Sequence, residues 1–126
     1  MEGMKPTAAE LEILSVLWRL GKATVRQVHT ELQKTKPTSY TTSLKLMQIM
    51  AEKGLVVRDE SERTHVYRPA VSKKAAQRRL VADLVDRAFG GSAAELVLQA
   101  LSHKRASREE IEEIRRMLDQ HEGGRR

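Results

Sequence analysis

The sequence predicts a mainly α fold: a winged helix-turn-helix with a small β-hairpin wing, followed by a region of further helices. Helical patterns with capping signals fill residues 8–53, and short β-prone runs replace them up to Pro69. Helical patterns resume after Ser72 and continue almost to the end of the chain. Three helices followed by a hairpin are the element order of a winged helix-turn-helix.

The first two helices begin at capping boxes. Thr7–Glu10 opens a helix over Ala8–Leu20, in which Trp18 is expected to lie in the core. Thr24–Gln27 opens a second, short helix. The segment Lys34–Pro37 ends it, because proline cannot continue a helix and pushes the preceding residue into extended backbone.

The third helix has two different faces. It is expected over residues 39–53, with Thr38 or Ser39 as N-cap and Gly54 as the left-handed residue that ends it. One arc carries side chains suited to a core: Tyr40, Ser43, Leu44, Leu46, Met47, Met50 and Ala51. The opposite arc carries Thr41, Thr42, Lys45, Gln48 and Ile49, with one carboxylate, Glu52, at its edge. This donor-rich face with little negative charge suits contact with a polyanion.

A hairpin with a mobile tip follows the third helix. Its expected strands are Leu55–Arg58 and Val66–Arg68, joined by the polar segment 59–65. Arg63 and Arg68 are candidates for contact with phosphate. The acidic side chains of Asp59, Glu60 and Glu62 argue against a deep insertion of this wing into a groove.

The composition narrows the class of partner. A chain of 126 residues holds one full domain, or a small domain with an extension. Its formal charge of +6 favours an anionic partner such as nucleic acid or a membrane surface, but the excess is spread evenly and is weak support by itself. With 3% aromatic residues, the core must consist of aliphatic side chains and Met.

Several classes of site are disfavoured. The absence of cysteine removes disulfides, thiolate metal sites and Cys nucleophiles. The four histidines have no metal-like spacing, and His29 is expected at the surface. There is no Gly-rich phosphate loop and no nucleophile–base set, so we expect no catalytic site, metal or cofactor. Without a signal peptide or a membrane-spanning apolar stretch, we expect a cytoplasmic protein with no membrane insertion.

The exposed face of the third helix is the best candidate for contact with DNA. The first turns of a recognition helix usually enter the major groove, where Lys45 can bond to guanine or phosphate and Gln48 to adenine. Ile49 is either a contact to a thymine methyl or a tolerated surface residue, and a solvated face is the alternative for the whole set. The ring of Tyr40 is expected to pack at the core edge, with its hydroxyl near a phosphate. The candidate DNA-contacting residues are Ser39, Tyr40, Thr41, Thr42, Lys45, Gln48, Ile49, Arg63 and Arg68.

The C-terminal region predicts three more helices, over residues 73–89, over 93–101 and after Ser107. The middle one is apolar on nearly every side, and the region is too small to bury three apolar faces alone. We expect a homodimer, since closed twofold dimers are the commonest assembly; the alternative is that these helices fold back onto their own N-terminal domain. The expected dimerisation residues are Leu80, Leu84, Phe89, Leu96, Leu98, Leu101, Ile111, Ile114 and Leu118. The expected domains are 1–71 for DNA binding and 72–122 for dimerisation, with a disordered tail at 123–126.

Several motifs occur in an order typical of one known family. They are Thr7–Leu14 with Trp18, Tyr40-Thr41-Thr42, Glu52–Val56, Arg58-Asp59 with His65–Pro69, and Phe89–Ser92. Over roughly residues 5–120 they resemble the penicillinase repressor (BlaI/MecI) family. The resemblance implies a dimeric bacterial transcriptional repressor that binds dyad-symmetric operators in double-stranded DNA. A winged-helix module that binds protein without specific DNA binding is the alternative, and the acid-poor face of the third helix argues against it.

The chain also departs from the pattern of this family. Lys45 and Ile49 stand where many members carry Thr and Arg, which predicts a different operator preference. In the β-lactam branch, a membrane-bound sensor with a protease domain leads to cleavage of the repressor, so an antirepressor protease or sensor system is an implied partner. Gln99-Ala100 replaces the Asn-Phe cleavage site of the staphylococcal repressors, which leaves open whether that step acts here. The copper-responsive branch uses a Cys-rich C-terminus, so copper sensing by that route is excluded.

Overall fold

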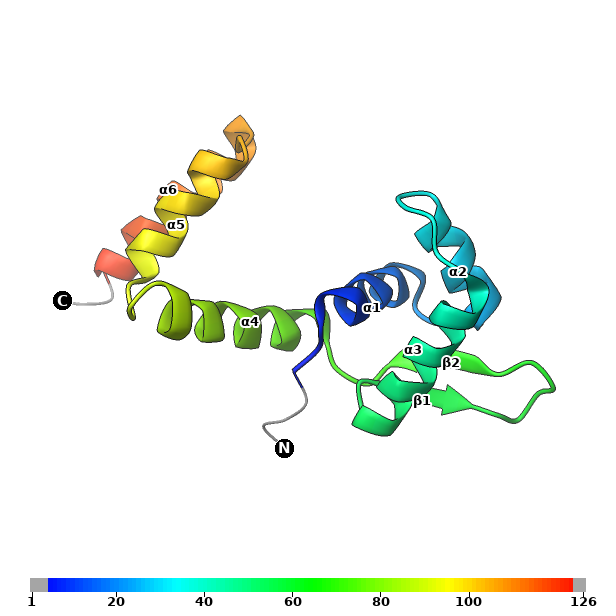
Figure 1. The fold of residues 1–126 in the computed structure, drawn as a ribbon. Coiled ribbons are helices and arrows are strands. Elements are labelled where there is room, and N and C mark those ends of the chain that lie inside the picture. The colour runs from blue at the N-terminus through cyan, green and yellow to red at the C-terminus, as the bar shows by residue number, and fades with distance from the viewer. Residues whose placement is uncertain (1–4, 124–126) are drawn as a thin grey trace. The chain divides into compact units, whose positions relative to one another are not determined.

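The structure is a computed structural model that describes residues 5–123. It confirms the mainly α fold, with three helices and a hairpin before further helices (Figure 1). The elements are α1 (Ala8–Leu20), α2 (Val25–Gln33), α3 (Tyr40–Lys53), β1 (Val56–Asp59), β2 (Val66–Pro69), α4 (Lys73–Ala88), α5 (Ala93–His103) and α6 (Arg108–Gly123). The chain forms two compact units, residues 1–80 and 81–126, so the division falls within α4.

The helix ends follow the local signals in the sequence. Thr7 and Glu10 form both bonds of the first capping box, with the Thr7 N–H 2.9 Å from Glu10 Oε1 and the Glu10 N–H 3.2 Å from Thr7 Oγ1. Thr24 and Gln27 form the second box, with distances of 2.8 and 3.1 Å. These bonds satisfy backbone donors that have no partner inside a helix, so the predicted starts of α1 and α2 are confirmed.

The core of the N-terminal unit lies where α1, α2, α3 and the hairpin meet. Its buried hydrophobic side chains are Ile13, Leu14, Val16, Leu17, Ala23, Val25, Val28, Met47, Met50, Leu55, Val56 and Tyr67. Apart from Tyr67 they are aliphatic or Met, as the composition predicts. Trp18 packs against this core but is only half-buried, and its indole N–H donates to the carbonyl of Val71 at 2.9 Å. Trp18 thereby ties α1 to the chain after the hairpin.

The hairpin is fastened to the helices at its base. β1 and β2 are antiparallel and pair Val56 with Pro69 and Asp59 with Val66. Ala23, between α1 and α2, exchanges two backbone hydrogen bonds with Tyr67 at 2.9 and 2.8 Å. The strands therefore have a fixed base, and their connecting tip projects away from the helices of this unit (Figure 1).

The C-terminal unit contains no fully buried side chain among its described residues. Its helices begin as predicted: Ser92 Oγ accepts from the Glu95 N–H at 3.1 Å, and Ser107 and Glu110 form a complete capping box. α6 extends to Gly123, so the expectation of a disordered tail is wrong at this residue. Residues 124–126 of that expected tail lie outside the described part of the chain.

Candidate nucleic-acid interface

The recognition helix α3 exposes the predicted set of side chains. Ser39 is its N-cap and accepts from the Thr42 N–H at 3.1 Å, and its hydroxyl also lies 2.8 Å from that of Thr42. Thr41, Thr42, Lys45, Gln48 and Ile49 are all exposed, whereas Ser43, Met47 and Met50 are buried. Ile49 is 37% exposed, so the core does not account for its position. The two faces derived from helical spacing are therefore those of the structure.

A polar contact joins α2 to α3 beneath this face. His29 is buried, with 7% of its surface exposed, so the expectation of a surface residue is wrong. Its Nδ1 lies 3.1 Å from Ser43 Oγ, and its ring meets that of Tyr40 edge-on with the centroids 5.6 Å apart. The crossing of α3 over α2 covers His29, and helical spacing within α2 alone does not report that crossing. His29 and Ser43 are hydrogen-bonded to each other, as buried polar groups normally must be.

A second buried polar contact holds the end of α3. Lys53 donates from Nζ to both carboxylate oxygens of Glu10, at 2.7 and 3.0 Å, and only 3% of the Glu10 side chain is exposed. Burial acts to raise the pKa of Glu10, but hydrogen bonds from Lys53 and Thr7 outweigh it and hold this pKa below its ordinary value. The recognition helix is thus fixed at both ends, by Ser39 and by Glu10.

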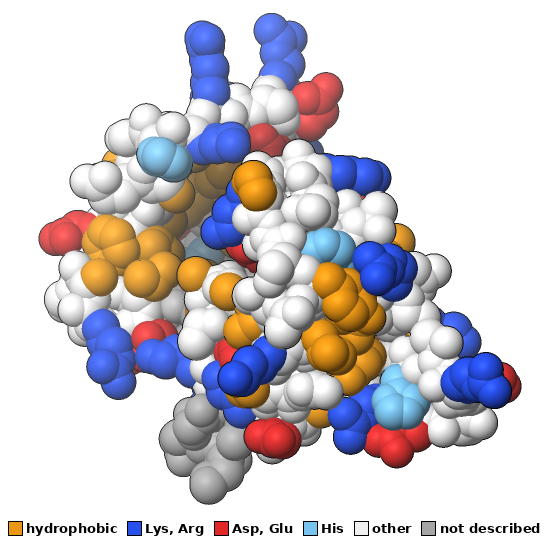
Figure 2. Space-filling model, turned by 45° about the vertical axis from the view of Figure 1, so that its right-hand side comes forward, with side chains coloured by type: hydrophobic (Ala, Val, Ile, Leu, Met, Phe, Trp, Pro, Cys, Tyr) orange, Lys and Arg blue, Asp and Glu red, His pale blue; other side chains and the backbone are white. Residues whose placement is uncertain are grey.

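A groove runs between α3, the start of α2 and the wing. Its volume is about 290 Å³, and it is lined by Thr24, Val25, Arg26, Tyr40, Leu44, Gln48, Arg58, Arg63, Thr64, His65 and Tyr67. The guanidinium carbon of Arg26 lies 4.2 Å from the centre of the Tyr40 ring, a cation–π contact. The view toward the wing side shows Lys and Arg side chains spread over the surface, with hydrophobic side chains grouped between them (Figure 2). The groove therefore extends the α3 face toward the wing with cations on its walls.

The wing presents its two predicted arginines differently. Arg63 lines the groove together with Tyr40 and Gln48. Arg68 is exposed on β2 next to the buried Tyr67, and adjacent strand residues point to opposite faces of a sheet. Tyr67 lines the groove, so Arg68 projects from the other face of the hairpin. The structure therefore groups Arg63, and not Arg68, with the face of α3.

The sequence interpretation missed two arginines, Arg26 and Arg58, that the structure places in the groove. Arg58 pairs with Glu60, its Nε 2.6 Å from Glu60 Oε2. Hydrogen bonding to Tyr67 and then to Glu60 raises the pKa of Arg58 above its ordinary value, so its charge is secure. Asp59 accepts from the Ser61 N–H at 3.0 Å, and this hydrogen bond lowers the pKa of Asp59. For Arg26, its position in the first turn of α2 was the signal in the sequence that could have indicated a place in the groove.

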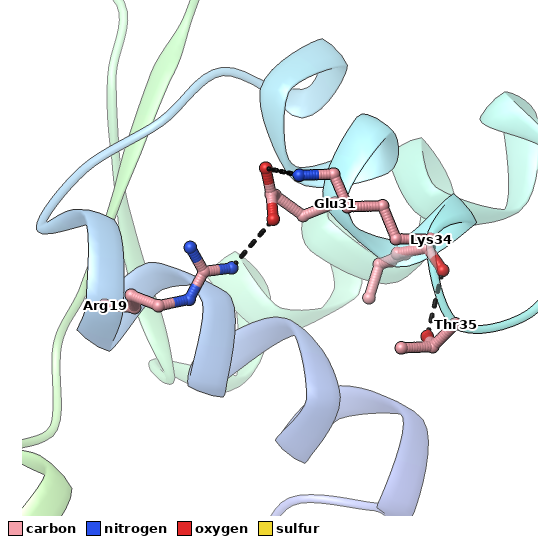
Figure 3. A network of polar contacts seen from close by, with 5 residues as sticks. Arg19, Glu31, Lys34 and Thr35 are labelled. Carbon is pink, nitrogen blue, oxygen red and sulfur yellow. Dashed lines mark hydrogen bonds and ion pairs between the residues drawn. The ribbon is translucent and has the colours of Figure 1, made fainter.

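The helices that carry α3 are also tied together at their surface. Arg19 of α1 and Lys34, just after α2, both pair with Glu31, at 2.9 and 3.0 Å (Figure 3). Hydrogen bonds from Lys34 and Arg19 lower the pKa of Glu31. Exposed pairs of this kind contribute little stability singly, so this network joins α1 to the end of α2 without adding much to the stability of the fold.

The expected dimerisation residues lie on surfaces that one chain leaves uncovered. Leu84, Leu98, Leu101 and Leu118 are exposed, Leu98 by 65% and Leu118 by 59%. Phe89, Leu96, Ile111 and Ile114 are half-buried within the C-terminal unit, and Leu80 is half-buried at the end of the N-terminal one. Further exposed apolar side chains occur on the same helices, at Val81, Val97 and Met117.

The described residues give no support for a metal site or for a membrane-spanning helix. Within residues 5–123, no three His, Cys, Asp or Glu side chains lie close enough together to hold a metal ion. No helix in the same range combines the length and apolar character needed to cross a bilayer.

Comparison with known proteins places the chain among repressors. It matches the family described as "Penicillinase repressor" over residues 6–120. The transcriptional regulator BlaI of Mycobacterium tuberculosis is 30% identical over 118 residues, covering 91% of this chain and 83% of that protein. The penicillinase repressor of Bacillus licheniformis is 27% identical over 113 residues, covering 90% of this chain and 88% of that protein.

A solved structure agrees with the fold of the N-terminal unit. The solution structure of the DNA-binding domain of the repressor BlaI is similar, with a TM-score of 0.50 and 28% identity, over 55% of this chain and 84% of that one. The likeness in sequence extends through both units, and the likeness in structure covers about half of the chain. The chain therefore belongs to the penicillinase repressor (BlaI/MecI) family of DNA-binding transcriptional repressors, not to a family of enzymes.

Proposed function

We propose that the protein represses transcription as a homodimer on a dyad-symmetric operator, each subunit placing α3 in the major groove of one half-site. The exposed face of α3 carries this proposal. It presents Thr41, Thr42, Lys45, Gln48 and Ile49 side by side, with a single carboxylate at its edge. Hydroxyl, ammonium and amide groups are the donors that bind phosphates and base edges.

The residues at the edges of α3 have different roles in this proposal. Ser39 and Tyr40 begin the helix, and the Tyr40 ring contacts both Arg26 and His29. In this proposal the Tyr40 hydroxyl binds a DNA phosphate. Arg63 contacts the DNA backbone from its place in the protein groove. Arg68 points from the other face of the hairpin, so it can serve only a DNA segment that passes on that side.

The exposed apolar side chains of α4 to α6 support the dimer. No described side chain of the C-terminal unit is fully buried, although α5 is apolar on nearly every side. Several large apolar side chains of these helices are exposed, among them Val97, Leu98 and Leu118, and exposed apolar surface that is gathered together is typical of an interface. A second copy of the chain would cover it, and twofold symmetry would match the two half-sites of the operator.

Two wider inferences follow from this function. A repressor acts where the chromosomal DNA lies, so we place the protein in the cytoplasm. Relatives of this chain are named as a penicillinase repressor and a methicillin resistance regulatory protein, which supports a sensor or antirepressor protease as a partner that relieves repression. Gln99 and Ala100 lie exposed within α5, so any cleavage there would require α5 to unwind first.

A gel shift on the promoter of the protein's own gene tests the proposal, with Lys45→Ala beside the wild type. We expect specific binding by the wild type that weakens steeply with added salt, and a loss of about tenfold or more in the variant. Lys45 is exposed, so the substitution leaves the fold intact. Failure of the wild type to prefer promoter DNA over scrambled DNA at moderate salt would refute the proposal in favour of a protein-binding module.

A further inference from the structure

Arg58 lines the groove, and its guanidinium already forms an ion pair with a carboxylate of this chain. Its guanidinium pairs with Glu60 across a gap of 2.6 Å, and both side chains are reachable by solvent, at 33% and 53% exposure. Arg58 is paired with Tyr67 across the two strands, and both residues line the groove, where Tyr67 is buried. Arg58 therefore faces the space beside Gln48 with a carboxylate bound to one of its donors.

A carboxylate and a phosphate compete for the same donors. Each accepts hydrogen bonds from guanidinium N–H groups, and Arg binds either one with similar geometry. Glu60 lies two residues after Arg58, just beyond the end of β1, and its side chain is 53% exposed. It can swing away without disturbing the core, whereas the Arg58 backbone is held in the β1–β2 ladder opposite Tyr67.

We propose that Arg58 is a phosphate-binding residue of this interface and that Glu60 is its built-in competitor, so that DNA must displace the Glu60 carboxylate before Arg58 can bind. This rests on the proposed function and identifies a contact that it does not include. A competitor of this kind lowers the affinity for all DNA, because phosphate contacts carry no sequence information. The base contacts of α3 then contribute a larger share of the binding that remains.

The chain supplies a matched control for the test. Glu62 lies in the same tip and has no ion-pair partner among the residues that the structure describes, so Glu62→Gln makes the same change of charge as Glu60→Gln. Both variants, and each in an Arg58→Gln background, are titrated by fluorescence anisotropy against labelled duplex from the protein's own promoter and against a scrambled duplex. Circular dichroism melting checks that each variant is folded.

We expect Glu60→Gln to tighten binding about three- to tenfold, and Glu62→Gln by less than about twofold. The gain should be equal on promoter and scrambled DNA, and it should vanish in the Arg58→Gln background. If Arg58→Gln fails to fold, the comparison of Glu60→Gln with Glu62→Gln decides by itself whether Glu60 competes with DNA.

Two outcomes would overturn the inference and leave the proposed function standing. One is equal tightening by Glu60→Gln and Glu62→Gln. The other is a Glu60→Gln effect that persists without Arg58, since Glu60 would then act only as general negative charge. If the wild type shows no preference for promoter DNA, the proposed function itself fails, whatever the variants do.

Discussion

A buried carboxylate near the start of the chain holds the end of the recognition helix. Glu10 belongs to the capping box of α1 and at the same time accepts two hydrogen bonds from Lys53, the last residue of α3. The cap could be predicted from the sequence, because Thr7 and Glu10 are three residues apart. The pair with Lys53 could not, because it joins residues 43 positions apart and depends on how α1 and α3 pack.

Lys53→Met should destabilise the protein at neutral pH by about 1–3 kcal/mol, because it leaves the buried Glu10 carboxylate without its main donor. Lys45→Met, an exposed lysine of the same helix, should change the free energy of unfolding by less than about 0.5 kcal/mol. Urea unfolding followed by circular dichroism measures both. Equal effects of the two variants would show that the Glu10–Lys53 contact contributes nothing.

The same contact predicts a pH dependence. The pKa of Glu10 is lower in the folded protein than its ordinary value of 4.5, so the folded state releases this proton more readily than the unfolded chain. Its stabilising effect is therefore present above that value and is lost as the pH falls through and below it. The difference in unfolding free energy between the wild type and Lys53→Met should shrink between pH 7 and pH 3. A constant difference across this range would contradict the assignment.

Among the elements, those with local signals were predictable. Ser39 begins α3 and Gly54 ends it, as predicted, because a hydroxyl cap and a left-handed glycine act within one turn of the helix. The burial of His29 and the pairing of Ala23 with Tyr67 were not predictable, because each depends on an element distant in the chain. Arg58 was predicted as part of a strand, but its place in the groove depends on the packing of the hairpin against α3.

Gly54→Ala should destabilise the protein by about 1 kcal/mol through the backbone alone. Gly54 has a φ of +83°, and an added Cβ would meet no atom within 4 Å, so strain of the left-handed conformation is the only cost. Gly54→Asn should cost less, since Asn tolerates this conformation better than Ala. Chemical denaturation compares the three proteins, and an Ala variant as stable as the wild type would show that the helix end relaxes freely.

The whole molecule joins a DNA-reading unit to a unit that cannot bury its own apolar side chains. Helical patterns and composition were enough to expect both units. The division observed inside α4 was not predictable, since nothing in the sequence of that helix marks where its packing partners change. From these two units we predict that one protein molecule presents half of a DNA-binding surface. A dimer would then present a symmetric pair of recognition helices.

Methylation protection of guanine N7 on the promoter of the protein's own gene tests this account most directly, because N7 lies in the major groove. We expect the wild type to protect guanines in two inverted half-sites, with centres separated by about 10 base pairs or a multiple of that spacing. Lys45→Ala should lose protection in both half-sites at once. Protection confined to a single site without dyad symmetry, or none at protein concentrations that shift the DNA, would contradict the account.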